Sequence, residues 1–376
     1  MPLRILFWNQ EYVPSFGGVE IYTQNLAKAL IKRGHSVAVV TGHSKDDLPE
    51  ISEVEGVLVC RMAFFKALSS RDLAKIADVQ AKVLALKRTF KPDLVHVNFT
   101  DASPFFHLRT RKQHDVSLIV LHEASDYFMR SAPLIRTLAL RTDSIVAPSK
   151  FVADKFVNVL VGLESKMRII NNGVSEEFYL SVPDIGAGSM RRLLFAGRLV
   201  PEKGIGSLLE AVSILAAKGS PIRLTVAGAG PDFTALKEKA LQLNIGDIVD
   251  FVGLLSRAVL ASAVANASAV VVPSIGPEPF GLIAAEAALA GRPVIAARNG
   301  ALPEIVDDLR TGLLFEPGNA LDMSNAIERV VASPDFAARL GAAARSRALE
   351  RYTLSSMVDK YEHLYASLVR PDQDKP

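Results

Sequence analysis

Two basic side chains, Arg198 and Lys203, share one short loop in the second half of this 376-residue chain. The loop follows an apolar run that ends at Gly197 and precedes a helical pattern that begins near Ile205. Arginine offers phosphate oxygens a planar fork of donors, and lysine adds a mobile point charge. We therefore interpret the loop as a candidate phosphate site, with an ordinary solvated surface loop as the alternative.

A second strand-to-helix loop carries carboxylates. Glu278 precedes the predicted helix, and Glu286 lies inside it among small residues suited to packing against a sheet. A carboxylate in such a place needs a partner or a ligand, and the vicinal hydroxyls of a ribose would serve. The backbone amides near Gly281 and Leu282 would form the positive end of the helix, which attracts anions. The alternative for Glu278 is a simple charge partner of that helix end.

Glycines lie between the first predicted strand of the chain and its helix. Gly17 and Gly18, in the string FGGVE, would let the backbone approach a ligand closely, and a plain tight turn is the alternative. Neither this string nor AGAGPD, at Ala227 to Asp232, completes the pattern GxGxxG. The sequence therefore argues against a dinucleotide-binding dehydrogenase.

A histidine directly follows the predicted strand Ser117 to Leu121. Ligands of parallel sheets bind outside the carboxyl ends of the strands, so His122 is placed to hydrogen-bond one. A satisfied structural histidine is the alternative. Glu123 and Asp126 are nearby candidates for acid–base groups, whereas His35, beside a different strand, is expected to be structural.

Short β-branched runs alternate with helical patterns in both halves of the chain, which predicts α/β domains with parallel sheets covered by helices on both faces. In the first half, the predicted strands are Arg4 to Phe7, Ser36 to Thr41, Leu58 to Met62, Leu94 to Val97, Ser117 to Leu121 and Ser144 to Ala147, with a helix from about Val19 to Arg33. In the second half, they are Leu193 to Ala196, Arg223 to Ala227, Ile248 to Phe251, Ala269 to Val272, Pro293 to Ala296 and Gly312 to Phe315.

The segment Ser181 to Ser189 is rich in Gly, Pro and Ser and is the predicted linker. It divides the chain into an N-terminal Rossmann-like domain, 1–182, and a C-terminal domain, 183–354, with a last helix at about 355–370 that is expected to pack back on the first domain. Two doubly wound sheets in tandem bring two sets of strand ends together, so the cleft between the domains is the expected site.

Composition excludes several classes of protein. The hydrophobic fraction of 49%, the charged fraction of 22% and the net charge of +3 describe a globular chain without the basic excess of a nucleic-acid-binding protein. The single cysteine, Cys60, excludes an intramolecular disulfide and a cysteine-rich metal site, and fits a reducing compartment. The apolar stretch Ala258 to Ile275 is interrupted by Asn266 and reads as a helix and a buried strand. We therefore expect a cytoplasmic protein.

Together the motifs resemble those of the family 4 retaining glycosyltransferases, also called glycosyl transferases group 1, which have the GT-B fold. The strongest likeness is in two glutamates with seven residues between them, Glu278 and Glu286, behind PSIGPEPFG and ahead of GRPVIA. The resemblance covers nearly the whole chain through further strings in order: APSKF (147–151), NNGV (171–174), GRLVPEKG (197–204), AGAGPD (227–232) and NGALPEIV (299–306).

The resemblance implies roles for residues of the second half. Arg198 and Lys203 would bind the donor diphosphate, Glu278 the hydroxyls of the transferred sugar, and Glu286 the ribose. The backbone of Phe280, Gly281 and Leu282 would cap the phosphate, and Gly197 and Gly228 would complete the donor site. The family commonly has two glycines where Asn299 and Gly300 stand, and Asn tolerates unusual backbone conformations.

The resemblance also implies roles for the first half. The loop of Gly17 and Gly18 would approach both the donor phosphate and the acceptor, and His122 would hydrogen-bond the transferred sugar. The acceptor side would be lined by residues that end two predicted strands or follow them: His96, Asn98, Glu123 and Asp126.

The predicted function is transfer of a hexose-type sugar from a nucleotide diphosphate sugar to a hydroxyl of a glycan, lipid-linked or small-molecule acceptor. Arg198, Lys203, Glu278 and His122 form the predicted catalytic set, and no metal or cofactor is expected. The alternatives are a GT-B epimerase or phosphorylase and a catalytically silent nucleotide-sugar-binding protein. The donor base and sugar, the acceptor, the linkage and the oligomeric state stay open.

Several relatives of this kind bind membrane surfaces through a basic, apolar face, and the first half carries basic residues among apolar ones. They are Arg109, Arg111, Lys112, Arg130, Arg136 and Arg141. Each basic residue near an anionic membrane contributes about 1 kcal/mol to binding. Peripheral contact with a membrane is one interpretation of this face, and a solvated surface over an ordinary core is the other.

Overall fold

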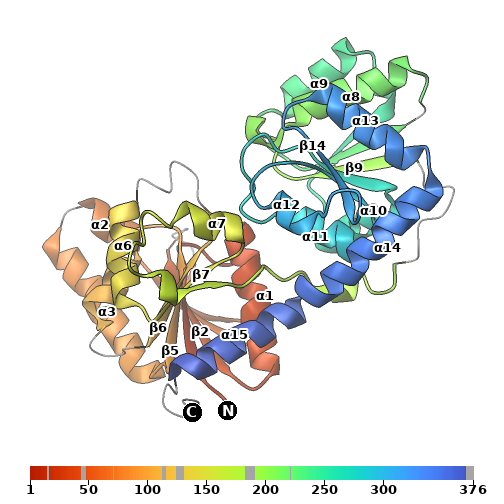
Figure 1. Cartoon of the computed structure of the whole chain (residues 1–376). Helices are drawn as coiled ribbons and strands as arrows, with labels where there is room; N and C mark the ends of the chain where they lie inside the picture. The colour runs from red at the N-terminus through yellow and green to blue at the C-terminus, as the bar shows by residue number, and fades with distance from the viewer. Residues whose placement is uncertain are drawn as a thin grey trace. The chain divides into compact units, whose positions relative to one another are not determined.

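The computed structural model describes residues 1–14, 17–43, 48–70, 72–111, 116–123, 131–182, 191–220 and 222–369. The chain forms two compact units (Figure 1). The N-terminal unit comprises Met1–Gly173 and Leu354–Pro376, and the C-terminal unit comprises Val174–Thr353. The C-terminal unit begins before the predicted linker because Val174 is buried in its core and donates to the carbonyl of Tyr352 at 2.8 Å. Most of that linker, residues 183–189, lies outside the described residues.

The N-terminal unit is built on an eight-stranded sheet of order β3-β4-β2-β1-β5-β6-β7-β8. Its strands are β1 (Arg4–Trp8), β2 (Ser36–Gly42), β3 (Ile51–Val54), β4 (Val57–Met62), β5 (Leu94–Phe99), β6 (Ser117–Leu121), β7 (Ser144–Ala147) and β8 (Met167–Ile169). All neighbouring pairs are parallel except β3 with β4. The six strands predicted for this half are confirmed.

The two strands that the sequence did not predict, β3 and β8, form the edges of this sheet. Strand β3 is largely exposed and lacks the apolar run of a buried parallel strand. A two-residue turn, Glu55 and Gly56, joins it to β4, and both residues have positive φ angles, of 52° and 82°. Such a turn suits an antiparallel hairpin.

Helices cover both faces of this sheet, as predicted. One face packs on α1 (Gly18–Lys32) and α15 (Leu354–Val369), whose side chains share one core with β1 and β2. The opposite face packs on α2 (Phe64–Ser70), α3 (Leu73–Phe90), α4 (Pro104–Arg109), α6 (Ala132–Arg141) and α7 (Lys150–Lys155). A buried hydrogen bond of 2.5 Å from the Tyr22 hydroxyl to the Tyr361 hydroxyl fixes α15 on α1.

The C-terminal unit contains a six-stranded parallel sheet of order β11-β10-β9-β12-β13-β14. Its strands are β9 (Arg192–Ala196), β10 (Arg223–Ala227), β11 (Val249–Gly253), β12 (Ala269–Val272), β13 (Val294–Ala297) and β14 (Gly312–Phe315). Its helices are α8 (Ile205–Ala217), α9 (Phe233–Gln242), α10 (Arg257–Asn266), α11 (Leu282–Leu289), α12 (Leu302–Ile305), α13 (Ala320–Val331) and α14 (Pro334–Arg351). All six strands predicted for this half are present.

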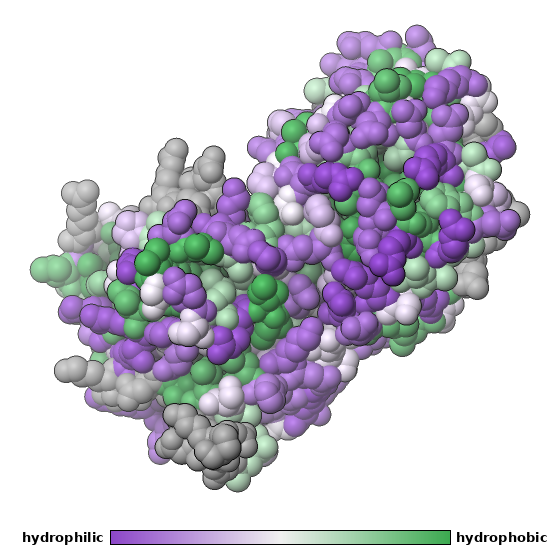
Figure 2. Space-filling view, in the orientation of Figure 1, coloured by the Kyte–Doolittle hydropathy of each residue, from purple (hydrophilic) through white to green (hydrophobic). Residues whose placement is uncertain are grey.

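Hydrophilic residues cover much of the visible surface of both units, with hydrophobic patches between them (Figure 2). Among the described residues, no helix is long and apolar enough to cross a membrane. The apolar stretch noted in the sequence forms α10 and the buried strand β12, as predicted.

Candidate functional site

The strand order of the C-terminal sheet reverses between β9 and β12, which are parallel neighbours. Open α/β sheets bind ligands outside the carboxyl ends of the strands at such a switch point. The loop after β9 carries Arg198 and Lys203, and the loop after β12 carries Glu278. Three of the predicted site residues therefore lie on the two loops that flank this point.

Lys203 and Glu278 form an ion pair, with Nζ 2.5 Å from Oε1. The same oxygen accepts a hydrogen bond of 2.5 Å from the hydroxyl of Ser274. Oε1 is thus fully used, whereas Oε2 has no hydrogen-bond partner among the described residues. Because the Glu278 side chain is almost buried but retains 11% exposure, its second oxygen is available to a ligand.

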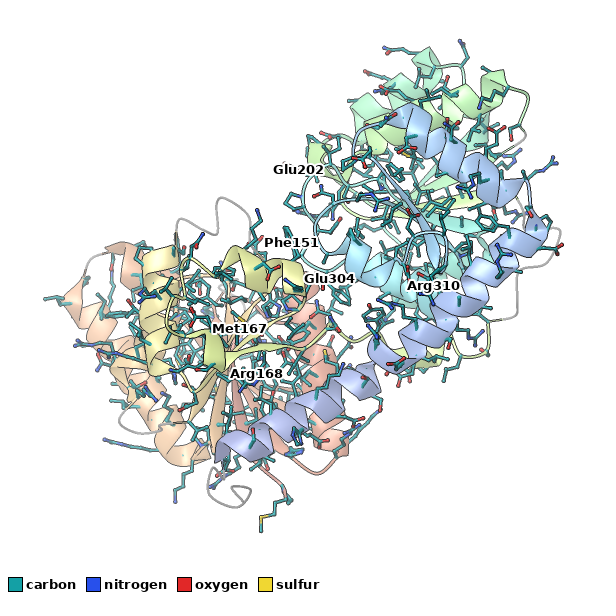
Figure 3. All side chains as sticks on the ribbon, viewed as in Figure 1. Phe151, Met167, Arg168, Glu202, Glu304 and Arg310 are labelled. Atoms are coloured by element: carbon teal, nitrogen blue, oxygen red, sulfur yellow. The ribbon has the colours of Figure 1, made fainter. Side chains whose placement is uncertain are left out.

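Arg198 differs from Lys203 in its surroundings. It is exposed, and it makes no hydrogen bond or ion pair with any residue that the structure describes. The loop between β9 and α8, on which Figure 3 labels Glu202, therefore presents one cation already paired and one unpaired. An anion that binds here would meet Arg198 directly and would compete with Glu278 for Lys203.

The amino end of α11 carries no capping side chain and no acidic residue in its first turn. Its N-cap residue is Gly281, whose φ of 98° a residue with a side chain would rarely adopt. Phe280, just before it, buries its ring against Tyr352 at 5.7 Å, so only its backbone can face a ligand. Leu282 is 36% exposed. Uncapped amides at a helix amino end attract anions, which makes this end suitable for a phosphate.

Two predicted glycines of the donor site let neighbouring loops touch. Gly228 has a φ of 148°, and a Cβ atom on it would lie 1.8 Å from the carbonyl oxygen of Gly197. The backbone amide of Gly197 in turn donates to Ala227 at 3.0 Å. These contacts show a packing reason for glycine at position 228, in addition to the predicted approach of a ligand.

Glu286 lies near Tyr179 and Arg257, neither of which was predicted to be a site residue. Burial raises the pKa of the Glu286 carboxyl to about 7, and the nearby Arg257 charge and Tyr179 hydroxyl oppose that rise. The Arg257 guanidinium also lies over the ring of Phe178 at 5.4 Å. These neighbours could not be predicted, because residues 179, 257 and 286 are far apart in the chain and belong to no common pattern.

The strand order of the N-terminal sheet also reverses, between β1 and β5. At this point a buried polar network leads to His122. The His122 ring nitrogen Nε2 lies 2.7 Å from Oδ1 of Asn98, and the Asn98 amide donates to Asn9 Oδ1 at 2.9 Å and to Thr23 Oγ1 at 3.1 Å. Because the Asn98 amide nitrogen is already donating, its Oδ1 must accept, and Nε2 of His122 carries the proton.

Burial lowers the pKa of His122 to about 3. The ring packs edge-on against Tyr22, with centroids 5.0 Å apart. His122 is therefore a neutral imidazole at neutral pH, and its Nδ1 has the lone pair of an acceptor. A neutral histidine in this tautomer can receive a hydrogen bond from a hydroxyl, and it cannot supply a positive charge.

His96 and Asn98, predicted to line the acceptor side, are both buried, with exposures of 0% and 1%. His96 instead hydrogen-bonds the Tyr365 hydroxyl of α15 through Nδ1 at 2.6 Å. The prediction of a ligand-facing role is corrected for both residues, because β5 is a central strand with helices on both faces. Asn98 acts behind His122, and His96 belongs to the core.

Gly17 forms the N-cap of α1, and Gly18 is exposed at the first position of that helix. A Cβ atom on Gly17 would lie 2.3 Å from Oε2 of Glu20, whereas one on Gly18 would meet nothing within 4 Å. The carboxylate of Glu20 thus lies against the first turn of its own helix. Gly18 is the more open of the two glycines.

Of the residues still to be placed in the N-terminal unit, some are described by the structure and others are not. Glu123 is half-buried beside His122, while Asp126 lies outside the described residues. Of the basic residues, Arg136 donates to the carbonyls of Val159 at 2.8 Å and Val161 at 3.2 Å, so its guanidinium holds a loop of its own unit.

Two more of these basic side chains have partners within the unit. Arg111 lies 3.9 Å from a carboxylate oxygen of Asp143, and Arg109 lies over the ring of Phe105 at 6.0 Å. Arg141 is exposed, and Lys112 and Arg130 lie outside the described residues. Three of the four described residues thus have structural contacts, which favours the solvated-surface interpretation.

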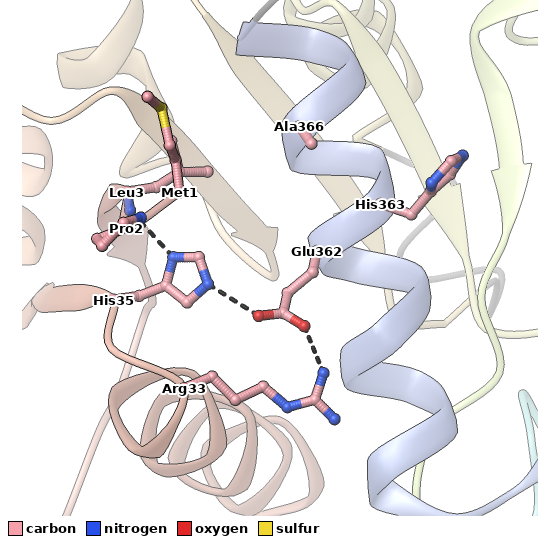
Figure 4. Close-up of a pocket in the computed structure, with 8 residues that line it drawn as sticks. All are labelled: Met1, Pro2, Leu3, Arg33, His35, Glu362, His363 and Ala366. Atoms are coloured by element: carbon pink, nitrogen blue, oxygen red, sulfur yellow. Dashed lines mark hydrogen bonds and ion pairs between the residues drawn. The ribbon is translucent and has the colours of Figure 1, made fainter.

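A cavity of about 460 Å³ lies beside α15, and none of the predicted site residues lines it (Figure 4). In it, Nδ1 of His35 accepts from the amide of Leu3 at 3.1 Å, and Nε2 lies 2.9 Å from Glu362, which also pairs with Arg33. These contacts tie α15 to the amino end of the sheet, and they confirm that His35 is structural.

Two doubly wound parallel α/β units, with cations and carboxylates at the strand ends of the second, define a protein of the GT-B class. A family model described as "Glycosyltransferase Family 4" matches residues 16–178, and one described as "Glycosyl transferases group 1" matches residues 187–347. The chain belongs to this family of glycosyltransferases, as its motifs predicted.

Curated relatives span the whole chain. An uncharacterized glycosyltransferase of Methanocaldococcus jannaschii is 25% identical over 388 residues, which cover 97% of this chain and 98% of the relative. A glycogen synthase of Mycobacterium tuberculosis is 27% identical over 404 residues, covering 99% and 96%. The D-inositol 3-phosphate glycosyltransferase of Gordonia bronchialis is 27% identical over 397 residues, covering 95% and 86%.

Solved structures share the fold. A sucrose-phosphate synthase of Thermosynechococcus elongatus superposes with a TM-score of 0.82 at 24% identity, covering 98% of this chain and 100% of that one. Anabaena HepE, in complex with UDP and glucose, superposes with a TM-score of 0.78 at 20% identity, covering 97% and 100%. The predicted fold class is thereby confirmed.

Proposed function

We propose that this glycosyltransferase is a retaining enzyme that moves a hexose-type sugar from a nucleotide diphosphate sugar to a hydroxyl group. The observation that carries the proposal is the arrangement at the C-terminal switch point. Arg198 has no ion-pair or hydrogen-bond partner among the described residues, Lys203 is held by Oε1 of Glu278, and the other oxygen of that carboxylate is available. The first two features suit a diphosphate, and the third suits a sugar hydroxyl.

The amino end of α11 adds to the anion site. In the proposed complex, the amides after Gly281 and the two cations share the negative charge of the diphosphate. Preorganised charges of this kind stabilise a departing group by several kcal/mol, since they need no reorganisation when the charge develops. Glu286 would accept a ribose hydroxyl in its deprotonated form.

The proposed reaction breaks the bond between the anomeric carbon and the diphosphate oxygen and forms a bond from the acceptor oxygen to that carbon. The acceptor proton passes to the departing phosphate on the same face, and the configuration at the anomeric carbon is retained. This scheme assigns no protein nucleophile, because Glu278 is committed to Lys203 and Ser274 through one oxygen and to the sugar through the other.

We propose that no metal ion or cofactor takes part, since Arg198 and Lys203 supply positive charge at the place where a divalent ion would otherwise act. Excess EDTA should then leave the transfer rate within about twofold of the untreated rate. A loss of activity that magnesium restores would contradict this part of the proposal.

The acceptor is assigned only as a class, the hydroxyl of a glycan, a lipid-linked molecule or a small molecule. The names of the curated relatives include both a glycogen synthase and an inositol phosphate glycosyltransferase, so the family context supports this breadth.

The experiment is a screen of UDP-, GDP- and ADP-sugars for nucleoside diphosphate release, first without and then with candidate acceptors. We expect slow hydrolysis of one donor class and faster release with an acceptor, with product whose anomeric configuration by NMR matches that of the donor. Inverted product would contradict retention. Binding of a donor without hydrolysis or transfer would favour a silent binding protein, and release of a sugar phosphate would favour a phosphorylase.

A further inference from the structure

Asn299, which stands where the family commonly has glycine, uses its side chain as a link between two loops. Its amide nitrogen lies 2.5 Å from the carbonyl oxygen of Ile275 and 3.4 Å from that of Ser274. Asn299 is absent from the residues with positive φ, whereas Gly300 has a φ of 58°. An unusual backbone conformation therefore does not explain why asparagine stands at this position. The hydrogen-bond donor of its side chain explains it.

The loop of Asn299 touches the loop of Glu278 at a second place. The amide of Ala301 donates to the Glu278 carbonyl at 2.8 Å. A Cβ atom on Gly300 would lie only 2.4 Å from both the nitrogen and the oxygen of Glu278. The segment Ser274–Glu278 is thus held by the loop after β13 at its beginning and at its end.

The opposite side of this segment is held by the loop that carries Lys203. The carbonyl of Glu202 accepts hydrogen bonds from the amides of Ile275 at 2.8 Å and Gly276 at 2.9 Å. Ile275 is therefore bound on one side through its amide and on the other through its carbonyl. The segment lies between Glu202, which precedes Lys203, on one side and Asn299 on the other. Its position determines where Glu278 meets Lys203.

We propose that Asn299 is a positioning residue for glycosyl transfer, acting through the segment Ser274–Glu278 on the Glu278 carboxylate. This inference rests on the proposed function, since it assigns Glu278 to the sugar. Without the amide, two carbonyls lose their donor and the segment gains freedom at the end where Ser274 holds Oε1. A misplacement of about 1 Å at a reacting group can cost up to about a hundredfold in rate.

The variants Asn299→Ala and Asn299→Asp separate the donor group from the shape of the side chain. Aspartate has the same shape but cannot donate when ionised, so both variants should lower kcat by about tenfold. The Kd of the nucleoside diphosphate should change by less than about threefold, because no hydrogen bond or ion pair between described residues joins Arg198 to this link. Asn266→Ala is the matched control, since the Asn266 amide also donates to a carbonyl, that of Ser262, but on α10.

A double-mutant cycle with Glu278→Gln decides whether Asn299 acts through Glu278. In the Glu278→Gln background, Asn299→Ala should lower the remaining donor turnover by less than about twofold. An equal tenfold loss in both backgrounds, or wild-type kcat in Asn299→Ala, would overturn the inference. If Asn299→Ala does not fold, Asn299→Asp, which keeps the side-chain volume, takes its place in the cycle.

A different set of results would show that the proposed function itself is wrong. Wild-type turnover in Glu278→Gln and in Lys203→Ala would remove the assignment of the site, whatever the Asn299 variants do. Strong losses in those two variants, combined with wild-type behaviour of Asn299→Ala, would leave the proposed function standing and refute only the role of Asn299.

Discussion

Lys203 and Glu278 are 75 residues apart in sequence, yet their side chains meet at 2.5 Å on adjacent loops of the C-terminal unit. The pair lies where the strand order of the sheet reverses, and Ser274 shares the same carboxylate oxygen. One oxygen of Glu278 therefore organises the site, and the other is left for the ligand.

Replacement of Glu278 by Gln should lower kcat/KM for the donor by about 10- to 100-fold, because a hydrogen bond to a charged group contributes about 1.5 to 3 kcal/mol. The Kd of the free nucleoside diphosphate should rise far less, since we propose that the carboxylate binds the sugar. Steady-state kinetics and calorimetry measure the two quantities. The control is Glu202→Gln, an exposed residue of the neighbouring loop whose backbone carbonyl supplies the contacts.

Asn98 should influence transfer only through His122, which it holds at 2.7 Å. We expect Asn98→Ala and His122→Ala each to lower kcat by about tenfold, and the double variant to be no worse than His122→Ala. Additive losses would show that Asn98 contributes separately, for example to folding. His43→Ala, which removes a bond to the carbonyl of Leu48, is the control for loss of a histidine.

The raised pKa of Glu286 should make the free energy of unfolding depend on pH. Its folded-state pKa, about 7, is raised above the ordinary value of 4.5, so the folded protein binds the extra proton between these values. The free energy of unfolding of the wild type, relative to Glu286→Gln, should fall by about 2 kcal/mol as pH rises from 4.5 to 7. Urea unfolding at several pH values measures this difference. A constant difference would show that the carboxyl is not buried in this way, and Glu328→Gln, from a surface pair with Lys218, is the control.

The lowered pKa of Lys87 should make the free energy of unfolding change with pH in the opposite direction, at higher pH. It is 2% exposed, bonds His107 at 3.0 Å and Thr110 at 2.9 Å, and burial lowers the pKa of its amine from 10.5 to about 7. The unfolded chain therefore binds the extra proton between these values, and wild-type stability should rise with pH by up to about 1.4 kcal/mol per unit. Lys87→Met should lack this rise in chemical denaturation. An identical slope in both proteins would contradict the prediction.

Much of the fold could be predicted because buried parallel strands are short apolar runs between helical patterns. Strand β3 was not predicted because it lies at an exposed edge of the sheet, where the apolar pattern is weak. The placement of Arg198, Lys203 and Glu278 on neighbouring loops followed from the rule that parallel strands end at one edge of the sheet.

The details of the site depend on contacts that local sequence does not encode. His96 has the residue type and strand position of a ligand-facing group, but Tyr365, 269 residues later, covers it. The link from Asn299 to Ile275 likewise depends on how closely two loops pack, which composition and periodicity cannot reveal.

Calorimetric titration of nucleoside diphosphates into the wild type and two variants measures whether the loops after β9 and β12 bind a diphosphate. We expect Arg198→Ala and Lys203→Ala each to weaken binding of the preferred nucleotide by more than about tenfold, in line with the loss of one charge-assisted contact of about 1.5 to 3 kcal/mol. Lys237→Ala, which removes a lysine that lies over Phe233 at 5.2 Å on α9, should bind like the wild type. Wild-type affinity in both Arg198→Ala and Lys203→Ala would show that these loops do not bind the diphosphate.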